Sequence, residues 1–361
     1  MKRLLTYLII VLLAARSLYA QDYRFSQFYN APLLLNPAFT GDHKSHYRMF
    51  LNYKDQWSSI SNSFKTVSGS FDMPAFEDVA GINKMGFGLS FLSDKAGSTN
   101  YGFNNINLSF AYHTRITRFS KLSGGLVFGY GQSQVNLDDV KWENQHNGNN
   151  HDPSLPSGEA VFADQIRYMD AGAGISYSSI DPENDMVYVI GLSATHLNFP
   201  NHSFIGQYQN RLKPKFQLHA EIDIGFEYFV LKPKLLVMNQ GPSTSFNVGS
   251  MARFKLGSQP DSRFTDAYVG SAFEIGMFYH FNESIIFMAQ YEFKRNLLIG
   301  LSYDIVISDL AAASASGGYE IALRYQGLFD NKRIKIKKDM EPSQQKKEKK
   351  KGKRAKTNVR M

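Results

Sequence analysis

The stretch 215–228 reads KFQLHAEIDIGFEY, and its apolar and polar side chains alternate along its length. Phe216 and Leu218 fall on one face of an extended chain, whereas Gln217 and His219 fall on the other. A helix would mix the two sets, because its side chains repeat every 3.6 residues rather than every two. The stretch is therefore predicted to be a β-strand with one apolar and one polar face.

Segments with this alternation recur from residue 47 to residue 329. An even number of them lets an antiparallel sheet close on itself, with no unpaired strand edge in lipid. The sequence thus predicts an all-β fold, a transmembrane antiparallel β-barrel of about 14 strands. The candidate strands are 47–56, 63–72, 84–93, 101–114, 121–132, 167–178, 186–196, 215–228, 229–239, 243–256, 267–280, 284–293, 296–305 and 318–329.

A soluble β-sandwich is the alternative fold for such a pattern, and it would carry dense charge on its outward faces. Here the non-apolar faces consist largely of Gly, Ser and Asn, as in Asn105–Tyr112 and Met169–Tyr177. Small residues with little charge suit the crowded, wet interior of a barrel. Glycines such as Gly86, Gly88 and Gly174 are interpreted as facing the lumen rather than as parts of nucleotide-binding loops.

The first twenty residues are typical of a secretory signal peptide. Lys2 and Arg3 precede an apolar run from Leu4 to Ala15, and cleavage is expected before Gln21. The run is shorter than the roughly 20 apolar residues that a membrane-spanning helix needs. The chain has no cysteine, which excludes thiolate chemistry and disulfides and suits an oxidising compartment.

The positive charge lies at the two ends of the chain and the body between them is mildly acidic. Lys2, Arg3 and Arg16 stand near the amino end, and residues 331–361 hold 14 Lys and Arg against 3 Asp and Glu. Such a tail, here residues 330–361, cannot bury enough apolar area to fold and is expected to be disordered. It is either a solvated appendage or an electrostatic docking segment for an acidic periplasmic partner or an anionic envelope surface. Nucleic-acid binding is disfavoured, because no aromatic residues are interleaved with the lysines. The candidate docking residues are Lys346, Lys347, Lys349, Lys350, Lys351, Lys353 and Arg354.

The spacing between strands favours one orientation in the outer membrane. If the first strand rises from the periplasm, the long gaps 133–166 and 197–214 lie outside the cell, where barrels place their long loops. Both termini are then expected in the periplasm. The gaps 73–83 and 257–266 are long for periplasmic turns, so the strand count is left open by two.

No motif in the sequence predicts catalysis or a cofactor. The nine histidines form no metal-binding pair, and Asp138–Asp152 lacks the ordered pattern of a calcium loop. No Gly-x-Ser-x-Gly element is present. We therefore expect a protein without enzymatic activity, bound metal or cofactor. One strand face would nevertheless line the lumen with polar groups, which could contact a guest segment or simply be hydrated; these are His219, Glu221, Asp223 and Glu227.

Two stretches near the amino end, QDYRFSQFYN at 21–30 and LNPAFTG at 35–41, resemble the start of the PorP/SprF family of outer-membrane proteins linked to type IX secretion. The stretches 299–304 and 317–323 are similar to the family's last two strands, although Tyr319 stands where His is common. The resemblance spans 21–329. Its motif residues, which are candidates for contact with a partner, are Phe25, Ser26, Gln27, Asn36, Pro37, Ala38 and Gly41.

Proline and glycine in this amino-terminal motif predict an ordered but irregular segment over residues 21–46. Pro37 disfavours a helical backbone at Asn36, and Gly41 permits a sharp turn. The segment is expected to pack either at the periplasmic mouth of the barrel, which spans 47–329, or inside it.

The resemblance implies a non-enzymatic accessory that helps a type IX system to export or retain surface proteins such as gliding adhesins. Its partners would be type IX components, the carboxyl-terminal sorting domains of secreted proteins, or both, together with the lipid bilayer. A passive outer-membrane pore for small solutes is the alternative, since fourteen strands could enclose an open channel.

Overall fold

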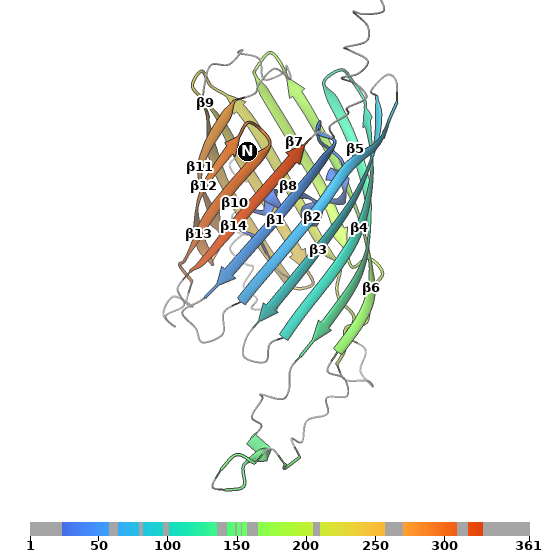
Figure 1. The fold of residues 1–361 in the computed structure, drawn as a ribbon, viewed down its shortest axis with the longest axis vertical. Coiled ribbons are helices and arrows are strands. Elements are labelled where there is room, and N and C mark those ends of the chain that lie inside the picture. The colour runs from blue at the N-terminus through green and yellow to red at the C-terminus, as the bar shows by residue number, and fades with distance from the viewer. Residues whose placement is uncertain are drawn as a thin grey trace, which may run out of the picture. The chain divides into compact units, whose positions relative to one another are not determined.

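Fourteen antiparallel strands form a closed barrel in which β14 lies beside β1 (Figure 1). The computed structural model describes residues 24–57, 64–78, 82–96, 101–135, 143–148, 150–152, 154–156, 165–204, 210–256, 270–308 and 317–327. The fold class and the strand number predicted from the alternation are confirmed within these residues. The strands are β1 Tyr47–Gln56, β2 Phe64–Glu77, β3 Asn83–Ala96, β4 Tyr101–Arg115, β5 Ser120–Gln134, β6 Gln165–Asp181, β7 Met186–Thr195, β8 Lys215–Gly225, β9 Phe229–Gln240, β10 Ser243–Leu256, β11 Ser271–His280, β12 Ser284–Phe293, β13 Leu297–Val306 and β14 Gly318–Gly327.

Helical structure in the described residues is confined to short turns. Three of them follow one another near the amino end, and none of the described helices is long and apolar enough to cross a membrane. They are the 3-10 turn η1 (Phe28–Asn30), α2 (Pro32–Leu35) and the 3-10 turn η2 (Pro37–Phe39), followed much later by η3 (Glu143–Gln145).

One strand prediction was too long. The strand expected over 215–228 ends at Gly225, because the amide of Phe226 donates to the carbonyl of Phe229 and closes a tight turn. Glu227 lies in this turn and is exposed. The prediction that Glu227 shares the lumen face of His219 was therefore wrong.

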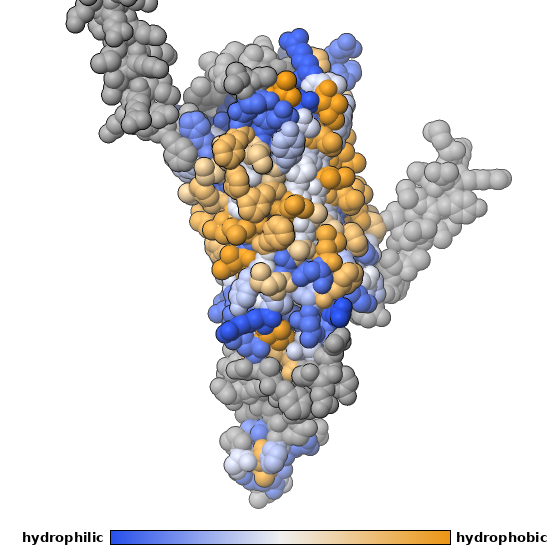
Figure 2. All heavy atoms as spheres, turned by 90° about the vertical axis from the view of Figure 1, so that its right-hand side faces the viewer, coloured by the Kyte–Doolittle hydropathy of each residue, from blue (hydrophilic) through white to orange (hydrophobic). Residues whose placement is uncertain are grey.

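The outward face of the barrel is an apolar belt. Outward side chains at alternate positions are aliphatic or aromatic and exposed, with Leu108 on β4 and Leu301 on β13 each 52% exposed. Figure 2 shows this belt as a hydrophobic band with hydrophilic residues above and below it. Because hydrocarbon is the environment that such a band matches, the belt fits the outer face of a membrane barrel.

The barrel has two different ends. We call the end where β1 begins and β14 ends the proximal mouth, and the end where β1 ends the distal mouth. The ends of β5 and β7 and the starts of β6 and β8, which the two longest sequence gaps join, lie at the distal mouth. The orientation expected from the loop lengths would place this mouth on the outside of the cell.

Replacing a belt residue by arginine should destabilise the protein. We expect Leu108→Arg, at the middle of β4, to lower the free energy of unfolding in lipid vesicles by about 2–4 kcal/mol. Ile116→Arg is the control, since Ile116 is 57% exposed but lies in the turn after β4. Equal urea-unfolding midpoints for both variants would contradict a lipid-facing belt.

Candidate functional site in the barrel lumen

The lumen of the barrel is occupied by the chain's own amino-terminal segment. We call residues 24–42 the plug; its three helical turns lie inside the ring of strands (Figure 1). Several of its side chains lose almost all contact with solvent, and Gln27, Asn36 and Thr40 are each 0% exposed. All seven family-motif residues, from Phe25 to Gly41, are buried here. Of the two locations considered for this segment, the structure shows the one inside the barrel.

Side chains of the barrel wall donate hydrogen bonds to backbone carbonyl groups of the plug along its length. A buried carbonyl group that loses water needs another donor, because leaving it unpaired costs about 1–3 kcal/mol. Five side chains from β1, β7 and β8 supply donors: Asn52 to the carbonyl of Asn30 at 3.0 Å, Gln217 to Leu34 at 3.2 Å, Ser193 to Leu35 at 2.6 Å, Arg48 to Phe39 at 3.0 Å and Lys54 to Arg24 at 3.3 Å.

Acidic wall residues hold the amino end of the plug at the distal mouth. The carboxylate of Glu320 accepts from the backbone amides of Ser26 at 2.7 Å and Gln27 at 3.1 Å. The Ser26 hydroxyl donates to Asp304 at 2.6 Å, and Lys54 lies 3.2 Å from the same carboxylate. Our sequence analysis did not single out Glu320 and Asp304. The signal in the sequence was an acidic residue at a lumen-facing position near the distal end of each of β13 and β14.

The first described residue is tied to the turn between β11 and β12. Arg24 donates to Glu283 at 2.6 Å and lies 2.8 Å from His280. Burial alone would raise the pKa of Glu283, but the hydrogen bond from His280 and the charge of Arg24 together lower that pKa well below its usual range. The Glu283 carboxylate therefore stays charged at neutral pH and anchors Arg24.

Asn36 is the central contact of the plug. Its backbone is extended, with φ −156° and ψ 121°, as predicted for a residue before Pro37. Its side-chain oxygen accepts from the amide of Ala38 at 2.9 Å. Its amide nitrogen donates to the carbonyl of Ile175 at 3.0 Å and lies 3.0 Å from His219. Asn36 thus shapes the plug and fastens it to the wall.

Glycines on the wall make room for the plug. A Cβ atom on Gly86 would lie 2.1 Å from the backbone carbonyl oxygen of Thr40, and one on Gly174 would lie 2.1 Å from the side-chain oxygen of Asn36. Both distances are too short for any real contact. The interpretation of these glycines as lumen-facing is confirmed, and the structure adds the reason: the plug backbone passes where their side chains would be.

On the side of the lumen formed by β9 to β12, the plug packs through apolar side chains. Tyr29 stacks on Phe278 at 6.1 Å between ring centroids, and the ammonium of Lys234 lies 4.4 Å from the Tyr29 ring centroid. Such contacts exclude water and fix the plug laterally. The buried cluster consists of Phe28, Leu35, Leu236, Met251, Phe278, Ile286 and Met288.

Charged residues hold the carboxyl end of the plug at the proximal mouth. Gly41 adopts φ +70°, which bears out the predicted sharp turn, and its amide donates to Asp72 at 2.7 Å. Arg48 lies 2.7 Å from the same carboxylate. Asp42 pairs with Lys121. Burial opposes ionisation of Asp42, but Lys121 outweighs it and lowers the pKa of Asp42 below its usual value.

The predicted lumen residues have different surroundings. His219 contacts the plug through Asn36. Glu221 pairs with Lys234, and Asp223 lies 3.7 Å from Lys232, so both acids are neutralised by β9. The seven tail residues proposed for docking, Lys346 to Arg354, lie outside the described residues.

The plug crosses the barrel from one mouth to the other. Arg24 contacts the turn 281–283 at the distal mouth, whereas the amide of Gln326, near the end of β14, donates to Asn296 at the proximal mouth. The first described residue therefore lies at the mouth opposite the end of the last strand. The expectation that both termini lie on the periplasmic side rested on the even strand count and the loop lengths. Residues 1–23 and 328–361 lie outside the described residues, so it stays a prediction, and the position of Arg24 favours the distal mouth for the mature amino end.

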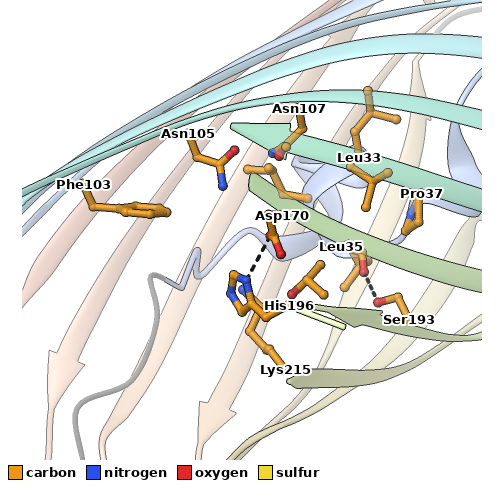
Figure 3. Close-up of a pocket in the computed structure, with 14 residues that line it drawn as sticks. Leu33, Leu35, Pro37, Phe103, Asn105, Asn107, Asp170, Ser193, His196 and Lys215 are labelled. Atoms are coloured by element: carbon orange, nitrogen blue, oxygen red, sulfur yellow. Dashed lines mark hydrogen bonds and ion pairs between the residues drawn. The ribbon is translucent and has the colours of Figure 1, made fainter. Parts of the chain in front are cut away.

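A pocket remains between the plug and strands β4 to β8 (Figure 3). His196 lies 2.9 Å from Asp170 on its wall. The Ser193 hydroxyl donates to the Leu35 carbonyl rather than to this histidine, so no Ser-His-Asp relay is formed here. Elsewhere in the described part of the chain, no three His, Cys, Asp or Glu side chains converge to hold a metal ion.

A family model described as type IX secretion system membrane protein PorP/SprF matches residues 17–325. The chain belongs to the PorP/SprF family. The family and the barrel together indicate an outer-membrane protein associated with type IX secretion machinery. The matched range includes the entire plug, so this segment lies within the family homology.

Solved structures similar to this family member are barrels with little sequence identity. A mutant of the TodX monoaromatic hydrocarbon channel has 11% identity and a TM-score of 0.47, covering 83% of this chain and 94% of that chain. A FadL homologue of Pseudomonas aeruginosa has 8% identity and a TM-score of 0.45, covering 87% and 96%. None of the curated protein sequences matches the chain.

A methyl group facing the plug should displace it. A Cβ on Gly125 would lie 2.4 Å from the backbone of Pro37, whereas one on the neighbouring Gly124 meets nothing within 4 Å. We expect Gly125→Ala to destabilise the protein by about 1–3 kcal/mol and Gly124→Ala to leave stability nearly unchanged. Urea unfolding in detergent measures both, and equal midpoints would show that the plug does not press on β5.

The ion pair of Arg24 with Glu283 should give a defined pH dependence. Because the folded-state pKa of Glu283 is lowered, its stabilisation is fully present above the unfolded value of about 4.3 and is lost as the pH falls below it. The difference in unfolding free energy between wild type and Glu283→Gln should therefore be equal at about pH 7 and pH 5, and smaller at about pH 3. A difference that disappears already between pH 7 and pH 5 would contradict this assignment.

The threading direction predicts where the mature amino end emerges. If cleavage occurs before Gln21, only three residues precede Arg24, and they span at most about 11 Å, less than the roughly 25 Å apolar band. An epitope between Asp22 and Tyr23 should bind antibody on intact cells. The same epitope in the proximal turn 182–185 should be reached only after the cells are permeabilised. The reverse pattern would contradict the combined threading and membrane orientation.

Proposed function

We propose that this protein is a non-enzymatic outer-membrane accessory of type IX secretion, which assists the export or the surface retention of secreted proteins. The observation that carries the proposal is the plugged lumen in a member of the PorP/SprF family. Residues 24–42 are bonded to the wall at both mouths, through Glu283 and Glu320 at one end and Asp72 at the other.

A filled lumen favours work at the surfaces of the barrel over conduction through it. A solute pore needs a continuous wet path, and here Phe28 and Tyr29 pack against Phe278 on β11, while Asn36 bonds β6 on the other side. Removing the plug would expose the acids that now bind its backbone amides and its arginine. The loss of these hydrogen bonds and of this ion pair would oppose removal of the plug, which supports a plug that stays in place during function.

The partners proposed are type IX components and the carboxyl-terminal sorting domains of secreted proteins. In the orientation given by the loop lengths, the distal mouth offers its long connections to a cargo domain outside the cell. The proximal mouth would face periplasmic components of the secretion machinery. The lipid bilayer contacts the apolar belt between them.

A locked plug tests this function directly. The hydroxyls of Thr40 and Ser109 lie 2.9 Å apart, and the chain has no other cysteine to interfere, so Thr40→Cys with Ser109→Cys should form a disulfide between plug and β4. In cells lacking the native protein, this variant should display surface cargo at wild-type levels, with and without reductant. Each single variant is the control.

Two results would contradict the proposal. Normal display of surface cargo by cells without the protein, together with loss of small-solute uptake, would support the pore alternative. Failure of the disulfide variant in display, with recovery on reduction, would mean that the plug must leave the lumen. In planar bilayers the full chain should give no large steady current.

A further inference from the structure

Exposed charges on the strands differ between the two halves of the barrel. In the distal half, the charged strand residues classed as exposed among those described are Lys65, Lys95 and Arg167, all of them basic. The proximal half exposes both signs, namely Glu77, Arg115 and Lys255. By strand alternation these three proximal residues lie on the lumen face, because Glu77 is opposite Lys84, Arg115 is opposite Lys121, and Lys255 shares the face of Arg253. Among the described strand residues, the exposed charges that face outward are therefore basic and lie in the distal half.

Lys65 and Lys95 lie directly opposite each other on β2 and β3. Their neighbours Thr66 and Asp94 bond to each other on the lumen side, so by strand alternation both lysines point outward. Facing residues have Cβ atoms about 4.5–5.5 Å apart, and like charges in such a pair repel each other. An anion bound between the two ammonium groups would offset this repulsion.

The only acid in the same cross-strand row is Asp55 on β1, opposite Lys65. Asp55 is 6% exposed, and its carboxylate accepts from the Tyr53 hydroxyl at 3.2 Å. Within the described residues, no salt bridge joins Asp55 to either lysine, so neither ammonium group has a direct ion-pair partner in this row.

Below the lysines, the outward face becomes apolar at once. Val67 follows Lys65 on this face, and the next pair is Gly69 opposite Phe91, whose ring lies across the glycine. Lysine beside an apolar surface is typical of the boundary between hydrocarbon and headgroups, because its long apolar stem lies along the apolar surface while the ammonium stays in water.

We propose that Lys65 and Lys95 bind a phosphate group of an anionic glycolipid in the outer leaflet of the membrane. The two ammonium groups sit at headgroup level, and the acyl chains of the lipid lie along the stripe from Val67 to Phe91. The phosphate relieves the repulsion between the lysines. Arg167, three strands from Lys95, provides a separate contact for another headgroup.

Binding of purified lipid A to the full chain in detergent tests this site. The probes are diphosphorylated lipid A, the same lipid after phosphatase treatment, and phosphatidylglycerol, each followed by native mass spectrometry. Lys65→Gln with Lys95→Gln should weaken binding of the phosphorylated lipid on the order of tenfold. The matched control, Arg118→Gln with Lys294→Gln, removes the same charge from two proximal turns, where each side chain lies beside an exposed phenylalanine ring, and it should bind as wild type does.

Three outcomes would overturn the proposal. They are equal affinity of wild type and the distal variant, an equal loss in the proximal control, and equal binding of the dephosphorylated lipid. Competition by phosphatidylglycerol as strong as that by lipid A would assign the lysines to any anionic phospholipid and overturn the glycolipid assignment. A gel shift on heating establishes that each variant is folded.

Discussion

A backbone amide or carbonyl group that lies away from bulk water must find a hydrogen-bond partner within the protein. In the bilayer this requirement closes the sheet, because an open strand edge in hydrocarbon would leave a row of unpaired groups. β14 therefore lies beside β1. Inside the barrel the same requirement governs the plug, whose carbonyls accept from Asn52, Ser193 and Gln217 on the wall.

Plug and wall are complementary in composition. The plug approaches the wall closely where the wall has glycine, as at Gly86 and Gly174, and it meets acids where its own amides point outward. Its apolar side chains meet the methionines and phenylalanine of β10, β11 and β12. The small residues of the lumen face thus serve a packed interior rather than an open channel.

Strand alternation made most of the fold predictable from sequence. The strand count, the apolar belt and the turn at Gly41 all follow from local patterns. The location of the plug could not be derived in this way, because its contacts join residues more than a hundred positions apart, as in Asn36 with Ile175. The alternation placed the acid Glu320 on the lumen face, but for the same reason its bonds to the Ser26 and Gln27 amides could not be derived. Glu227 was misplaced because a tight turn interrupts an alternation that the sequence continues.

The central claim is that residues 24–42 are a permanent, hydrogen-bonded part of the barrel interior. Amide hydrogen exchange followed by mass spectrometry on the full chain in detergent tests this claim most directly. Peptides covering Ser26 to Gly41 should exchange as slowly as those from the middle of β4 and β5. Exchange of these peptides at the rate of an unstructured chain, while the strands remain protected, would contradict the account.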